Sequence, residues 1–181
     1  MKALVVIDMQ EDFVRGSLGS PEAQVIVPAV AAKVAKYAHS EEETIILYTR
    51  DTHFDSYMDT MEGHYLPVPH CIVNTKGWQI IPEVMTNEGN IEIIDKYDFG
   101  SMGIADALQQ LACHAWNDWK IDEIEIVGLC TDICVITNAL ILKTAFRETL
   151  ITVDSKCCAG VTPEKHTAAL EVMRSCQIDV I

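Results

Sequence analysis

Short apolar runs alternate with amphipathic patterns along the whole chain, and this alternation constrains the fold more than any other feature. The runs predict strands, and the patterns between them predict helices with one apolar face. The expected strands are 3–7, 44–49, 91–94, 121–127, 150–153 and 178–180, and the expected helices are 21–39, 79–86, 104–119, 132–146 and 162–175. Apolar strands separated by helices predict a three-layer, doubly wound α/β fold: a mostly parallel sheet of about six strands with helices on both faces.

The chain of 181 residues contains no repeat, low-complexity tract or linker that would divide it. A chain of this length buries roughly 70% of its unfolded surface in one core. We therefore expect residues 1–181 to form a single domain. Within the helix expected at 104–119, Leu108, Leu111 and Trp116 are predicted to face the core.

Charge and cysteine content narrow the function classes. The chain has 13 basic and 27 acidic residues, a net charge of -14, so nucleic acid and anionic membranes are poor partners and a small molecule is the expected ligand. The first apolar run, 3–7, ends at Asp8 and is too short for a signal core or a membrane span, which favours a cytoplasmic protein. Seven cysteines, an odd number, suit reduced thiols, and we expect none to be bridged.

Functional side chains follow four of the expected strands. Asp8, Asp51 and Lys96 follow the first three, and the turn from Cys130 to Cys134 follows the fourth. A single Asp or Lys in such a position is more commonly a turn residue or a solvated charge. Because parallel strands end at one edge of the sheet, four such residues together predict a ligand site there.

Cys134 is the candidate nucleophile. The apolar run stops at Gly128, and if Asp132 caps the next helix, Cys134 falls in its first turn, where the helix dipole lowers the pKa of a thiol. The alternative is a buried structural cysteine. A redox or metal pair of Cys130 and Cys134 is a weaker interpretation, since such pairs usually have two intervening residues and this one has three.

A nucleophilic thiol needs a proton acceptor and a neighbouring charge that stabilises the thiolate. Histidines occur near strand ends only in the 51–73 segment, so Asp8 and Lys96 remain as the partners of Cys134. A carboxylate beside a thiol takes its proton and returns it to a leaving amine. A lysine holds both anions in place.

Three segments resemble, in order and spacing, the signatures of the isochorismatase-like cysteine hydrolases: LVVIDMQEDF (4–13), DKYDFGS (95–101) and GLCTDICV (128–135). The resemblance covers essentially the whole chain. It implies a catalytic triad of Asp8, Lys96 and Cys134. It also implies a cis peptide between Leu129 and Cys130, and an oxyanion hole made by the backbone N–H groups of Cys130 and Cys134.

The aperiodic segment 51–73 resembles the metal site of nicotinamidases. Asp51, His53 and His70 match the Asp-x-His…His pattern of those enzymes, and Glu62 and His64 are candidates for a further ligand. Imidazole and carboxylate donors suit Zn²⁺, with Fe²⁺ or Mn²⁺ as alternatives. In the alternative without metal, Asp51 caps the end of a strand and His53 is a surface histidine.

The resemblance implies a metal-dependent cysteine amidohydrolase that converts nicotinamide and water to nicotinate and ammonia through a Cys thioester, with no organic cofactor. Phe13 and Leu129 are the expected substrate contacts. The chain departs from common nicotinamidases at 66–68, Leu-Pro-Val, where those enzymes carry an aromatic residue. The family also implies a homo-oligomer, a dimer or a tetramer.

Three alternatives stay open. One is a metal-independent amidase that acts on a carbamoyl or ureido compound. Another is an isochorismatase, which lacks the catalytic cysteine, so Cys134 argues against it. The last is a non-catalytic protein that binds a small molecule in the same pocket.

Overall fold

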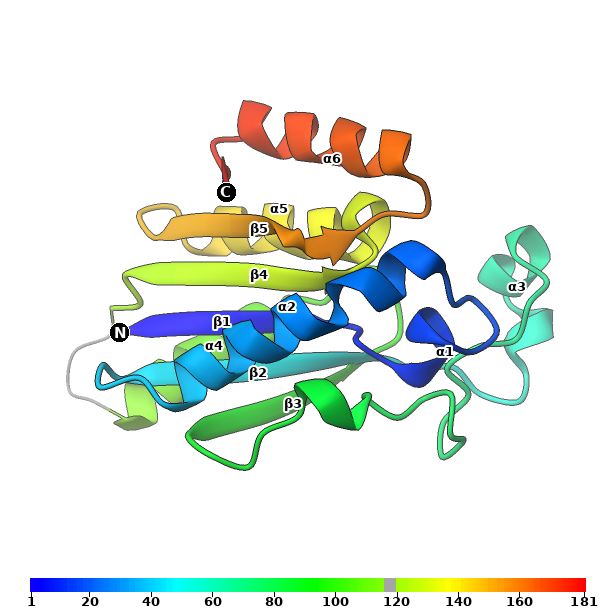
Figure 1. The fold of residues 1–181 in the computed structure, drawn as a ribbon, viewed down its shortest axis with the longest axis horizontal. Coiled ribbons are helices and arrows are strands. Elements are labelled where there is room, and N and C mark those ends of the chain that lie inside the picture. The colour runs from blue at the N-terminus through cyan, green and yellow to red at the C-terminus, as the bar shows by residue number, and fades with distance from the viewer. Residues whose placement is uncertain (116–119) are drawn as a thin grey trace.

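The structure, a computed structural model, describes residues 1–115 and 120–181. These residues contain a six-stranded sheet in the order β3-β2-β1-β4-β5-β6, and every neighbouring pair is parallel (Figure 1). The strands are β1 (Lys2–Ile7), β2 (Thr44–Asp51), β3 (Asn90–Lys96), β4 (Glu123–Leu129), β5 (Leu150–Ala159) and β6 (Asp179–Val180). The predicted doubly wound α/β fold is confirmed.

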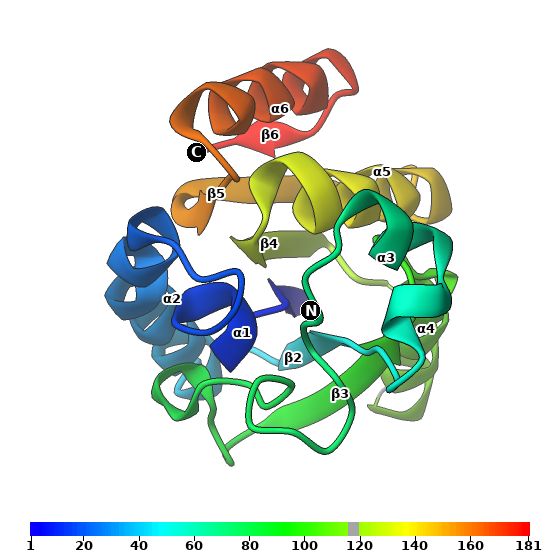
Figure 2. The same cartoon turned by 90° about the vertical axis from the view of Figure 1, so that its right-hand side faces the viewer.

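Helices cover both faces of the sheet (Figures 1 and 2). One face carries α1 (Glu11–Val14), α2 (Pro21–Ala38) and the 3-10 turn η2 (Pro82–Val84), and the other carries α4 (Met102–Ala115), α5 (Ile136–Ala145) and α6 (Pro163–Ser175). Alternate residues of β1 enter opposite cores: Leu4 and Val6 pack under α2, and Val5 and Ile7 pack under α4 and α5. This burial on both faces explains the uninterrupted apolar runs of the sequence.

Two of the long helices, α2 and α6, have side-chain caps and begin where the sequence predicts. The Ser20 hydroxyl accepts a hydrogen bond from the Ala23 N–H at 3.0 Å at the start of α2, and the Thr162 hydroxyl accepts one from the Lys165 N–H at 3.3 Å at the start of α6. Each helix has proline at its first position, where no N–H is needed.

The prediction of a helix at 79–86 is wrong. Only η2 forms a helical turn there, because the preceding residues pair with the chain that leaves β1. Ile80 forms an antiparallel bridge with Gln10, and the Ile81 N–H donates to the Met9 carbonyl at 2.9 Å. Residues 79–81 are therefore extended and pair with residues 9–11, which directly follow the end of β1.

Two other segments differ in detail from the sequence expectation. The aperiodic segment 51–73 contains the 3-10 turn η1 (Tyr57–Asp59) and the short helix α3 (Met61–Tyr65). The fifth strand continues past residue 153 to Ala159. Trp116, which we expected to face the core, lies outside the described residues.

None of the described helices is long and apolar enough to cross a membrane.

The strand order reverses direction at the β1–β4 pair, which is where ligands of such sheets bind. Gly128 makes the close approach of these strands possible. It has φ of +118°, and a Cβ there would lie 2.0 Å from the Ile7 carbonyl oxygen. Only glycine fits at this position, and its absence of a side chain lets the ends of β1 and β4 meet.

Candidate active site

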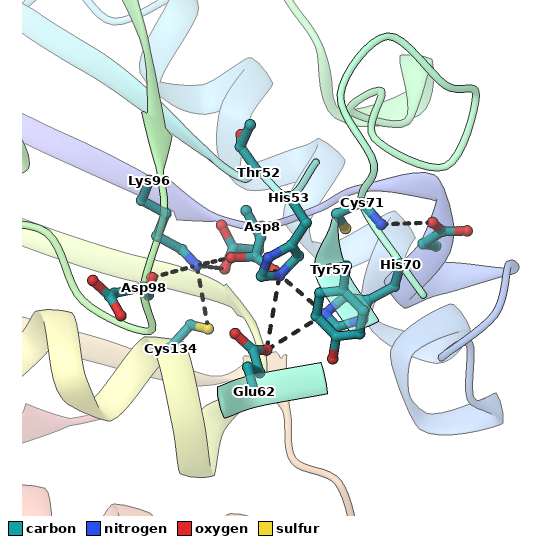
Figure 3. Close-up of polar contacts among 12 residues, drawn as sticks. Asp8, Thr52, His53, Tyr57, Glu62, His70, Cys71, Lys96, Asp98 and Cys134 are labelled. Atoms are coloured by element: carbon teal, nitrogen blue, oxygen red, sulfur yellow. Dashed lines mark hydrogen bonds and ion pairs between the residues drawn. The ribbon is translucent and has the colours of Figure 1, made fainter. Parts of the chain in front are cut away.

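The carboxyl ends of the central strands bring the predicted residues together (Figure 3). Asp8 directly follows β1, and Asp51 and Lys96 are register partners at the ends of β2 and β3. Cys134 lies in the helical turn η3 (Thr131–Val135), which follows β4. All four side chains are buried.

Lys96 lies at the centre of this group. Its Nζ is 2.8 Å from Asp8 Oδ2, 3.0 Å from Asp51 Oδ1 and 3.5 Å from Cys134 Sγ. It also donates to the Asp98 carbonyl at 3.2 Å. Burial disfavours the ammonium, but the negative charges of the carboxylates of Asp8 and Asp51 outweigh it and raise the pKa of Lys96 well above its usual value. Lys96 is therefore a fixed positive charge beneath the thiol.

Asp8 is held on both its backbone and its side chain by Thr49. The Thr49 hydroxyl donates to Asp8 Oδ1 at 2.6 Å and accepts from the Asp8 N–H at 3.0 Å. Asp8 has φ of +47°, an uncommon conformation for a residue with a side chain. Burial raises the pKa of Asp8, and the Lys96 charge acts in the opposite direction. A carboxylate with a raised pKa both accepts and returns a proton readily.

The surroundings of Cys134 contradict two expectations. Asp132 does not cap the helical turn, because its carboxylate accepts a hydrogen bond from the Val161 N–H at 2.8 Å and so holds the connection after β5. The pKa of Cys134 is not lowered: burial, and then the charge of Asp8, raise it well above the usual value despite Lys96. The thiol therefore keeps its proton in the resting site. The peptide between Leu129 and Cys130 is cis, as the family resemblance implies.

Beside this group, Asp51, His53 and His70 offer three donor atoms within 4.8 Å of one another. Asp51 Oδ2 lies 2.9 Å from His53 Nε2 and 3.5 Å from His70 Nε2. His70 Nδ1 lies 2.9 Å from the Val68 carbonyl, so a proton on Nδ1 leaves the Nε2 lone pair facing the other donors. Two imidazoles and a carboxylate, all buried, form a donor set that fits a divalent metal ion.

The structure distinguishes the two candidates for a further ligand. Glu62 Oε1 lies 3.7 Å from the Nε2 atoms of both His53 and His70. His64, on the same short helix, is exposed, and its ring packs edge-on against Tyr65. Glu62, and not His64, is therefore the residue placed beside the metal-compatible donors.

One carboxylate joins the two halves of the site. Asp51 contacts Lys96 through Oδ1 and the two histidines through Oδ2. Burial opposes its ionisation, but the hydrogen bonds of His53 and His70 and the charge of Lys96 outweigh burial and lower the pKa of Asp51. Asp51 is therefore a carboxylate anion shared between the buried lysine and the metal-compatible group.

Sequence reasoning missed three residues of this site. Thr49 binds Asp8, as described above. Gln10 holds the backbone of Asp51: its Oε1 accepts from the Asp51 N–H at 2.7 Å and its Nε2 donates to the Asp51 carbonyl at 2.9 Å. The Tyr57 ring lies edge-on against His53 and His70, with centroids 4.8 and 5.1 Å away. For Thr49 a signal was available, since it is a polar residue near the end of an apolar strand.

A cavity of about 340 Å³ opens over the thiol. Phe13 and Leu129, the expected substrate contacts, both line it, as do Cys130, Cys134 and the metal-compatible residues Asp51, Glu62 and His70. Further apolar walls come from Leu18, Leu66, Phe99, Ile133 and Val161. The Phe13 ring lies 5.5 Å from the ring of His70, centroid to centroid. A largely apolar cavity of this size, lined by a thiol and a metal-compatible group, suits a small-molecule ligand.

These features define a three-layer α/β protein with a buried thiol, lysine and carboxylate at the sheet edge, next to a metal-compatible group. The chain belongs to the isochorismatase domain family, which matches residues 2–181. It is similar to the nicotinamidase/pyrazinamidase of Mycobacterium tuberculosis (27% identical, covering 100% of this chain and 98% of the relative) and to the nicotinamidase of Escherichia coli (28%, covering 93% and 87%). Among solved structures, the pyrazinamidase of Pyrococcus horikoshii in complex with zinc superposes with a TM-score of 0.80 at 25% identity, covering 99% of this chain and 98% of that one.

Proposed function

We propose that this chain, an amide-bond hydrolase of the isochorismatase family, is a metal-dependent nicotinamidase that converts nicotinamide and water to nicotinate and ammonia. The observation that carries the proposal is the position of Cys134 Sγ. It lies 3.5 Å from Lys96 Nζ, which contacts Asp8, on the floor of the cavity that Asp51 and His70 also line. The similarity to nicotinamidases supports the choice of amide.

In the acylation step, Cys134 Sγ attacks the amide carbonyl carbon while Asp8 takes the thiol proton. Burial and the charge of Asp8 raise the pKa of the resting thiol, so the thiol needs the carboxylate of Asp8 as its proton acceptor in this step. The backbone N–H groups of Cys130 and Cys134 stabilise the oxyanion of the tetrahedral intermediate. The C–N bond then breaks, Asp8 donates its proton to the leaving nitrogen, and ammonia departs from a thioester on Cys134.

In the deacylation step, Asp8 accepts a proton from a water molecule as the water oxygen attacks the thioester carbon. The C–S bond breaks, the sulfur is reprotonated from Asp8, and nicotinate leaves. Lys96 stays protonated throughout, because its neighbours raise its pKa, and its charge stabilises the carboxylate of Asp8 and the sulfur as negative charge moves between them.

Asp51, His53 and His70 would hold the metal ion, with Glu62 placed for a further contact. A bound divalent ion supplies a Lewis acid for a lone pair of the substrate, and the donor set together with the zinc-containing relative favours Zn²⁺ over Fe²⁺ or Mn²⁺. Phe13 and Leu129 flank the same cavity and would hold a flat ring between them.

The test is ammonia release from nicotinamide. We expect activity in the wild type and its loss in Cys134→Ala, while Cys176→Ala, which removes an exposed thiol, serves as the matched control and stays active. Full activity of Cys134→Ala would refute the nucleophile. Activity that survives complete chelation would refute metal dependence and favour the metal-independent amidase.

A further inference from the structure

Asp12, in the short helix α1, connects this helix to the loop that carries His70. Its Oδ2 accepts a hydrogen bond from the Cys71 N–H at 2.8 Å (drawn at Cys71 in Figure 3), and its Oδ1 accepts one from the Ser17 N–H at 3.4 Å. Its own N–H donates to the Gly77 carbonyl at 3.0 Å. The half-buried side chain of Asp12 thus links its own segment to Cys71, which is 59 residues away in the sequence.

The backbone that Asp12 holds is the backbone of the metal-compatible group. Cys71 follows His70 directly, and the Cys71 carbonyl accepts a hydrogen bond from the His53 N–H at 3.0 Å. Cys71 has φ of +47°, a left-handed conformation that is unfavourable for a residue with a side chain. The hydrogen bond to Asp12 stabilises this conformation and holds the His70–Cys71 peptide next to the Cys71 carbonyl that binds His53.

The packing around Asp12 leaves room for its carboxylate and for little else. A Cβ on Gly77 would lie 2.0 Å from Oδ2 and 2.4 Å from Oδ1, and a Cβ on Gly16 would lie 2.3 Å from Oδ1. Two glycines in different segments therefore accommodate the same carboxylate. The next residue, Phe13, lines the cavity, and its ring lies 5.5 Å from the His70 ring, centroid to centroid.

We infer that Asp12 is a positioning residue, which sets the backbone of His53 and His70 at the spacing that one metal ion requires, without touching metal or substrate itself. Outer-sphere partners of this kind commonly change metal affinity by roughly 10–100-fold. The part of this inference that concerns metal rests on the proposed function. The part that concerns the loop backbone does not.

The experiment compares Asp12→Ala, Asp12→Asn and the control Asp55→Ala, which removes an exposed aspartate from the same segment as His53. Zn²⁺ affinity is measured by calorimetry on chelator-stripped protein, and amide exchange of His53 and Cys71 is measured by NMR in the metal-free state. For Asp12→Ala we expect Zn²⁺ binding weaker by roughly 10–100-fold and amide exchange faster by roughly tenfold. Asp12→Asn, which keeps an acceptor for the Cys71 N–H, recovers most of both, and Asp55→Ala matches the wild type.

Wild-type affinity and wild-type exchange in Asp12→Ala, with only a lower melting temperature, would overturn the inference and leave Asp12 a general stabiliser of the fold. If Asp12→Ala does not fold, the same two measurements are made on Gly77→Ala. Its methyl group displaces the Asp12 carboxylate without removing it, so we expect weaker Zn²⁺ binding and faster exchange, and wild-type values of both would overturn the inference. A wild type that binds no Zn²⁺ would refute the metal site of the proposed function, and the exchange measurement would still decide the role of Asp12.

Discussion

The hydroxyl of Thr49 makes two hydrogen bonds to the buried Asp8, and Thr49→Val removes both while nearly preserving side-chain shape. A hydrogen bond to a charged group contributes about 1.5–3 kcal/mol, and a buried N–H left unpaired costs about 1–3 kcal/mol. The added methyl group recovers about 0.8 kcal/mol through burial. We therefore expect Thr49→Val to lower the free energy of unfolding by about 2–5 kcal/mol.

The assay is urea unfolding of chelator-treated protein, so that metal binding does not contribute to stability. Thr49→Ser is the control, because it keeps the hydroxyl and loses only a methyl group, at a cost of about 1 kcal/mol. A loss below about 0.5 kcal/mol for Thr49→Val, or equal losses for both variants, would refute the reasoning from hydrogen bonds.

The same substitution also tests the role of Asp8 as proton acceptor. The hydrogen bond from Thr49 stabilises the ionised carboxylate and so lowers the pKa of Asp8, against the larger effect of burial. Without it the pKa of Asp8 rises further, and the fraction of ionised Asp8 falls at a given pH. The acidic limb of the pH profile of kcat/KM therefore moves to higher pH in Thr49→Val and stays in place in Thr49→Ser.

Three further predictions concern other parts of the site. Glu62→Gln weakens Zn²⁺ binding roughly tenfold in calorimetry, whereas His64→Gln matches the wild type; equal affinities would contradict the placement of Glu62. Lys96→Met lowers kcat about 10²–10³-fold in the ammonia assay, since it leaves two carboxylates buried without their cation, and a loss under tenfold would exclude Lys96 from the reaction. Gly128→Ala lowers the free energy of unfolding by about 3 kcal/mol or more, because its methyl group meets the Ile7 carbonyl; a loss under about 1 kcal/mol in urea would show that β1 and β4 separate easily.

The fold was predictable because burial on both faces leaves a direct trace in the sequence. Each central strand is an apolar run, and each covering helix repeats its apolar face. The second half of β5 left no such trace. Asp154 is an acidic residue in the middle of that strand, and it is compensated by Lys33 of α2 at 2.9 Å, a partner distant in the sequence.

The candidate site was predictable where it depends on topology. Asp51 and Lys96 end parallel strands and Asp8 directly follows one, and such ends meet whatever the details of packing. The choice between Glu62 and His64 was not predictable, because it depends on which face of α3 turns inward. Asp132 was wrongly expected to cap a helix, because nothing local shows that its carboxylate binds the Val161 N–H.

By itself, the sequence determined the order of strands and helices and the identity of the side chains at the sheet edge, because local periodicity and strand ends are properties of neighbouring residues. Only the tertiary structure decided the state of those side chains. The pKa of Cys134 is raised, where its position in a helical turn predicted a lowered one, because burial and the carboxylate of Asp8 outweigh the charge of Lys96. Burial and charge at a site are sums over residues that only folding brings together.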